Sequence, residues 1–117
     1  MCINCLFYYL MYDKFMLNTI QKGSVRCIIF KEEDTWYGVA LEFNITVDGD
    51  TPEIVGFELN QAIQGYVESV KKSNVRAENV LNQKASEEYE RLWNLLETKQ
   101  NIPSPYQVHS FGRQLTY

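Results

Sequence analysis

The stretch that decides the fold is WYGVALEFNITVDGDTPEIVGFELNQAIQGYVESV, which runs from Trp36 to Val70. Its first part is rich in aromatic and β-branched residues, and this composition predicts two short strands, at 36–43 and 45–47. A polar turn follows, and then apolar residues recur at three- and four-residue spacing, which is typical of an amphipathic helix. The stretch therefore predicts a small sheet with one helix packed on it.

The predicted helix has clear start and stop signals. Thr51 is a good N-cap, because its hydroxyl accepts a hydrogen bond from an otherwise unpaired backbone N–H. Pro52 suits the first helical position, and Glu53 suits the positive end of the helix dipole. Two lysines at 71–72 and the Ser-Asn pair at 73–74 favour an end there. The apolar stripe consists of Val55, Leu59, Ala62, Ile63, Tyr66, Val67 and Val70.

A third strand is predicted before this stretch. The segment VRCIIFK at 25–31 is β-branched and aromatic, and the short polar turn at 32–35 joins it to the 36–43 strand as a hairpin. A sheet of three strands has one apolar face to cover, and the helix supplies that cover. We therefore expect an α+β fold in the order β-β-β-α, with a three-stranded antiparallel sheet covered by one amphipathic helix over residues 23–74.

The remainder of the chain predicts a second helix and a tail. In the segment 75–100, Ser86 can cap a helix whose apolar stripe is Tyr89, Leu92, Trp93 and Leu96. Such a stripe is a core or a dimer contact. Residues 101–117 contain two prolines and no clear period, so we expect an extended tail, within which 106–111 can add to a sheet edge.

Residues 1–22 are predicted to be an apolar N-terminal extension. The uncharged run at 1–12 is too short to span a membrane as a helix, which needs about 20 residues. It also lacks the basic region and the cleavage motif of a signal peptide. Met11 or Met16 can be the true start of translation, and a weak membrane-surface anchor is the alternative.

The cysteines give a weak signal. Cys2 and Cys5 form a CxxC pattern, which would need further ligands from Cys27 and His109 to make a four-ligand zinc site. Cys27 is more simply a small buried apolar residue. Three cysteines do not make a disulfide framework, so we expect a reducing cytoplasm, and no cofactor is expected.

The charge of the chain is unevenly placed. Its 117 residues carry a formal net charge of −4, which does not favour indiscriminate nucleic-acid binding. No Lys or Arg occurs from Glu32 to Val70, although this span holds nine acids. Two interpretations stay open: a solvated face that keeps the protein soluble, or a surface complementary to a basic partner. The acids of the span are Glu32, Glu33, Asp34, Glu42, Asp48, Asp50, Glu53, Glu58 and Glu68.

The segment 25–67 resembles the HicB-like antitoxin family. The resemblance is carried by the strand VRCIIFKEED and by Trp36, Leu41-Glu42-Phe43, Ile45-Thr46-Val47, Gly49-Asp50-Thr51, Leu59 and Ala62-Ile63. It implies a β-β-β-α-β core, partly like ribonuclease H or a double-stranded-RNA-binding domain, with no catalytic residues. It also implies the family's role, which is to bind a small basic toxin that cleaves messenger RNA. An orphan member without a toxin is the alternative within the family.

The sequence thus favours a non-catalytic protein-binding module, with Trp36, Glu42, Asp48 and Asp50 as candidate partner-binding residues. One alternative is a metal-dependent nuclease, because two-metal chemistry needs convergent carboxylates such as those of Asp34, Glu42, Asp48 and Asp50. Another is a DNA-binding autorepressor, which the acidic character of the 86–97 helix disfavours. A homodimer is expected through a strand edge or through the Tyr89/Trp93 stripe.

Overall fold

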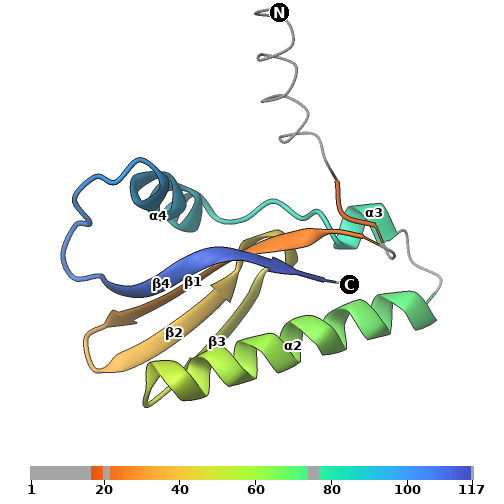
Figure 1. Cartoon of the computed structure of the whole chain (residues 1–117), viewed down its shortest axis with the longest axis horizontal. Helices are drawn as coiled ribbons and strands as arrows, with labels where there is room; N and C mark the ends of the chain where they lie inside the picture. Colours follow the sequence, from red (N-terminus) through yellow and green to blue (C-terminus); the bar gives the residue numbers. More distant parts are fainter. Residues whose placement is uncertain (1–16, 20–21, 74–76, 117) are drawn as a thin grey trace, which may run out of the picture.

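The computed structural model describes residues 17–19, 22–73 and 77–116. A four-stranded antiparallel sheet lies between two helices, with the strands in the order β3-β2-β1-β4 (Figure 1). Among the described residues, no helix is both long enough and apolar enough to cross a membrane. The elements are β1 (Ser24–Glu32), β2 (Thr35–Ala40), the 3-10 turn η1 (Leu41–Phe43), β3 (Ile45–Gly49), α2 (Pro52–Lys72), α3 (Ala77–Val80), α4 (Glu87–Glu97) and β4 (Gln107–Leu115).

The α+β class and the three predicted strands are confirmed, but the sheet has a fourth strand. β4 comes from the predicted tail and pairs with β1, with Val25 opposite Gln114 and Ile29 opposite Ser110. The ladder shifts between Ile29 and Phe30, where one strand bulges. The prediction of three strands was wrong because β4 is half exposed along its length and its partner lies at the other end of the described chain.

Helix α2 begins and ends where the sequence predicts. The Thr51 hydroxyl accepts from the backbone N–H of Ile54 at 3.2 Å, and the Ser73 N–H donates to the Val70 carbonyl at the other end. The apolar stripe packs on β2 and β3, where Gly38 makes close approach possible. A Cβ atom at Gly38 would lie 2.7 Å from Cγ1 of Val55, so any larger residue would push the helix off the sheet.

Helix α4 covers the other face of the sheet, so the molecule has three layers rather than the expected two (Figure 1). Ser86 caps this helix as predicted, accepting from the Tyr89 N–H. Leu92 and Trp93 pack with Ile28 and Phe30 of β1 and exclude water from that face. Because Trp93 is only 6% exposed, the Tyr89/Trp93 stripe is core and is not a free surface for a dimer.

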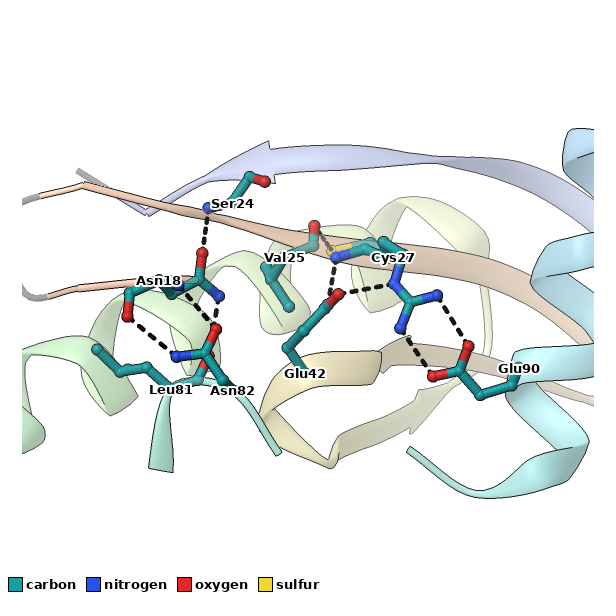
Figure 2. Close-up of polar contacts among 9 residues, drawn as sticks. Asn18, Ser24, Val25, Cys27, Glu42, Leu81, Asn82 and Glu90 are labelled. Carbon is teal, nitrogen blue, oxygen red and sulfur yellow. Dashed lines mark hydrogen bonds and ion pairs between the residues drawn. The ribbon is translucent and has the colours of Figure 1, made fainter. Parts of the chain in front are cut away.

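The packed structure reaches back before residue 23, the boundary expected from the sequence. The Asn18 side chain is buried, accepting from the Ser24 N–H at 2.7 Å and donating to the Leu81 carbonyl at 2.8 Å. Asn82 forms two further hydrogen bonds with the Asn18 backbone (Figure 2). These contacts fasten the end of the N-terminal segment to the α3–α4 connection. Cys2, Cys5, Met11 and Met16 lie outside the described residues.

Candidate binding site

Three of the four candidate residues meet at one end of the sheet. Trp36, at the start of β2, lies opposite Gly49 of β3, and its neighbour Tyr37 lies opposite Asp48. Asp50 follows directly in the connection to α2. This pairing exists because β2 and β3 are antiparallel, so the first residues of one strand meet the last residues of the other.

Carboxylates from the β1–β2 turn, from the end of β3 and the residue after it, and from the first turn of α2 lie at this corner. The β1–β2 turn and the start of α2 lie at the same end of the sheet (Figure 1). The exposed acids there are Glu33, Asp34, Asp48, Asp50 and Glu53, and we call this set the acidic end. Each of these side chains is exposed to water.

Trp36 is half-buried within the acidic end and is held by two contacts that the sequence did not reveal. Its ring meets the His109 ring edge to face, with centroids 5.9 Å apart. The Lys31 ammonium lies 5.9 Å from the centroid of the same ring. The His109 contact depends on the pairing of β1 with β4, which local sequence patterns do not encode, whereas Lys31 lies opposite Trp36 across the β1–β2 hairpin. Together they hold the amphipathic indole on the α2 face of the sheet. The Asp48 side chain lies on the other face, because Trp36 pairs with Gly49 whereas Asp48 pairs with Tyr37.

Glu42, the fourth candidate, is not part of the acidic end. It lies in η1, at the opposite end of β2 from Trp36, and its side chain is 18% exposed. Its Oε1 accepts from the Arg26 backbone N–H at 2.8 Å, and its Oε2 accepts from Arg26 Nε at 2.7 Å. The Glu42 carboxylate is therefore already bonded within the molecule, and we no longer consider it a candidate partner-binding residue (Figure 2).

The Glu42 carboxylate completes the sheet where β2 leaves it. The last pair of the β1–β2 ladder is Cys27 opposite Ala40, after which the chain turns into η1. The next outward N–H of β1 is that of Arg26, and the carboxylate takes the place of the missing strand carbonyl. An unpaired backbone N–H at this half-buried position would be costly, and the Glu42 side chain supplies the acceptor that a strand carbonyl would otherwise provide.

Arg26 links this carboxylate to α4. Its two terminal nitrogens donate to the two Glu90 oxygens at 2.9 and 2.8 Å, and its guanidinium lies 5.7 Å from the Trp93 ring centroid. Burial opposes the charge of Arg26, but the hydrogen bonds to Glu90 and Glu42 more than offset this and raise its pKa. The pair of acids and the arginine thus fasten α4 to the sheet.

The alternative nuclease site needs acids that converge on a metal. Among the described ranges, no three side chains of His, Cys, Asp or Glu lie close enough to hold an ion. Asp34 lies in the β1–β2 turn, Asp48 in β3 and Asp50 in the β3–α2 connection, and Glu42 is at the far end of β2. Cys27 points into the α2 side of the sheet, and burial, reinforced by the Glu42 charge, raises the pKa of its thiol to about 12. It is therefore a protonated thiol at neutral pH.

A hollow lies between α4 and the connection that follows it. It has a volume of about 290 Å³, which is near the lower limit for small-molecule sites. Its polar groups are already occupied in part, because the Tyr106 hydroxyl donates to the Glu88 carboxylate. The lining residues are Glu88, Arg91, Leu92, Leu95, Pro103 and Tyr106.

In comparisons with known proteins, no family model matches the chain, and neither a curated protein nor a solved structure is significantly similar to it.

Proposed function

We propose that the chain is a non-catalytic binding module that presents its acidic end to a small basic protein. The observation that carries this proposal is the grouping of five exposed carboxylates at the end of the sheet where the half-buried Trp36 lies. Lys31 is the one Lys or Arg side chain in contact with that indole among the described residues. A surface of this kind attracts cations over several ångströms, and Trp36 adds an aromatic contact at the same end of the sheet.

The resemblance to the HicB-like antitoxin family supports a specific form of this proposal. In that form the basic partner is a toxin that cleaves RNA, and binding at the acidic end covers the basic surface the toxin needs for RNA. The order of elements, three strands and a helix followed later by a fourth strand, is the order that the resemblance implies. The orphan alternative keeps the binding role with a different basic partner, and both forms place the chain in the cytoplasm.

The binding mode has a definite salt dependence. The Debye length is about 10 Å at 0.1 M salt and about 3 Å at 1 M. Exposed carboxylates such as Asp48 and Asp50 therefore steer a basic partner at low salt and lose most of this effect at high salt. The association rate should fall with salt, whereas the aromatic contact at Trp36 should mainly affect the dissociation rate.

The test is affinity purification of the tagged chain from its own cells at low and at moderate salt, followed by mass spectrometry. A variant with Asp48→Lys and Asp50→Lys should lose the basic partner. The matched control is Glu68→Lys with Glu97→Lys, which makes the same change in net charge at exposed positions away from the acidic end. The control should retain most of the partner, since distance and screening weaken its effect.

Two outcomes would contradict the proposal. Equal loss of the partner in both double variants would show that net charge, rather than the acidic end, controls binding. Cleavage of RNA by the pure protein with Mg²⁺, abolished by Asp48→Asn, would show that the module is catalytic. Circular dichroism of each variant verifies that the fold is unchanged.

A further inference from the structure

The two edges of the sheet differ in how well they are protected. The β3 edge is five residues long, is flanked by α2 and carries an exposed aspartate. The β4 edge is nine residues long, contains no proline or lysine, and displays Phe111 at 45% and Leu115 at 60% exposure. Short length, proline, lysine and β-bulges are the usual protections of an edge. β4 is long and lacks proline and lysine, and its bulge lies before Ser110, so residues 110–115 form a regular edge.

The outward groups of β4 follow from its ladder with β1. The Thr116 N–H donates to the Gly23 carbonyl at 3.1 Å, so Thr116 directs its backbone groups toward β1. Alternate residues of an antiparallel strand direct their N–H and C=O groups to opposite sides, and the register is regular from Ser24 to Ile29. Phe111, Arg113 and Leu115 therefore direct both backbone groups away from β1. No other described strand is paired on that side.

This edge is complementary to itself in one register. A symmetric antiparallel pair must be centred on one residue, and hydrogen bonding requires outward residues to face outward residues. Centring on Gly112 places Phe111 opposite Arg113 of the second copy, which is a favourable cation–aromatic pair. Centring on Arg113 would place the two guanidinium groups opposite each other, and like charges in that position repel.

The two side chains are already ordered for such a pair. Phe111 meets the Trp93 ring edge to face at 5.5 Å, and the Arg113 guanidinium lies 5.8 Å from the same ring. Pairing therefore immobilises few new rotamers. Gly112 at the centre leaves room for close approach, because a Cβ atom there would meet nothing within 4 Å.

We infer that the free edge of β4 pairs with the β4 edge of a second copy of this chain, antiparallel and centred on Gly112. The two sheets then join into one, with a two-fold axis between the Gly112 residues. Phe111 and Arg113 of each copy exchange backbone hydrogen bonds with Arg113 and Phe111 of the other. The pairing is centred on Gly112, outside the acidic end, and does not depend on the function proposed there.

Disulfide cross-linking tests the register. Gly112 is a non-hydrogen-bonded position in this pair, so its two Cα atoms should be about 4.5 Å apart, within the range for a disulfide. In a chain whose native cysteines are serine, Gly112→Cys should give a covalent dimer under mild oxidation. The matched control is Ser110→Cys on the same strand face, whose copies should be about 14 Å apart at 3.4 Å per residue. Efficient cross-linking through Ser110→Cys rather than Gly112→Cys would overturn the register.

Sedimentation equilibrium over a concentration series tests the edge itself. The unmodified chain should show the mass of two copies, and Arg113→Pro should be monomeric, because proline removes an outward N–H without touching the ladder to β1. Arg113→Ala is the control, since it loses the side chain but keeps the N–H, and it should weaken the dimer less. A monomer at every concentration, or a dimer that survives Arg113→Pro, would overturn the inference.

Discussion

Glu42 is predicted to be a structural residue whose loss destabilises the fold, and this can be measured. Replacing it by Ala leaves the Arg26 backbone N–H without an acceptor and removes one partner of the Arg26 guanidinium. An unsatisfied donor costs about 1–3 kcal/mol. The guanidinium keeps Glu90, so the full cost of about 3–5 kcal/mol for an unpaired buried charge does not apply. We therefore expect Glu42→Ala to lower the free energy of unfolding by about 2–3 kcal/mol.

Two companion variants separate the hydrogen bond from the charge. Glu42→Gln keeps an oxygen that can accept from the Arg26 N–H, so it should lower the free energy of unfolding by only about 1 kcal/mol. Glu90→Ala removes a side chain that is 40% exposed, so solvent screening limits the loss to about 0.5–1 kcal/mol. Glu42→Ala should be the most destabilising of the three variants. Glu90→Ala should destabilise the fold as much as Glu42→Gln or less.

Urea unfolding followed by tryptophan fluorescence and by far-UV circular dichroism measures these differences. Trp93 belongs to α4 and lies against Arg26, so it reports on that layer, while Trp36 reports on the other end of the sheet. The reasoning would be refuted if Glu42→Ala cost no more than Glu90→Ala. It would also be refuted if Glu42→Gln were as damaging as Glu42→Ala, since the backbone acceptor would then not matter.

Two further predictions concern glycine positions and the buried thiol. Gly38→Ala should lower the thermal midpoint and cost about 1–3 kcal/mol of stability, because the new Cβ would overlap Val55. Gly65→Ala, on the exposed side of α2, should instead raise the stability by about 0.5–1 kcal/mol. Equal effects of the two variants in calorimetry would contradict this reasoning. With Cys2 and Cys5 replaced by Ser, Cys27 should react with iodoacetamide at pH 8 on the order of 10³-fold more slowly than a free peptide thiol, because its pKa is raised to about 12. An alkylation rate equal to that of the peptide would contradict the raised pKa of Cys27. Because the folded state disfavours the thiolate, Cys27 also stabilises the fold below about pH 9, and this contribution to stability is lost as the pH rises toward 12.

Local signals predicted α2 and α4 because the capping residues and the apolar period of each helix lie within one short segment. Thr51, Pro52 and Ser86 mark the helix starts, and the apolar stripes that follow have the helical period. The hairpin of β1 and β2 is equally local, since the turn between them is short. These elements could therefore be placed from the sequence to within a few residues.

What could not be predicted depends on pairs that are distant in the sequence. β4 is an edge strand with a polar, half-exposed pattern, and no feature of its own sequence indicates that it pairs with β1. Glu42 and Asp48 are both acids in a span without Lys or Arg, yet one binds Arg26 and the other is in water. The difference lies in Arg26, which precedes that span, and in Glu90 of α4. The sequence therefore located the acidic end but could not tell which of its candidate acids belonged there.

The pairing of β1 between β2 and β4 also affects how the chain is made. A hairpin such as β1–β2 forms locally within microseconds, but β4 joins β1 across most of the described chain and raises the contact order of the fold. During synthesis, residues 107–115 leave the ribosome after everything they pack against. Until then, no other strand among the described residues pairs with the outer edge of β1. The nascent chain therefore passes through an interval in which this apolar strand is open to pairing with a neighbour on the same messenger RNA.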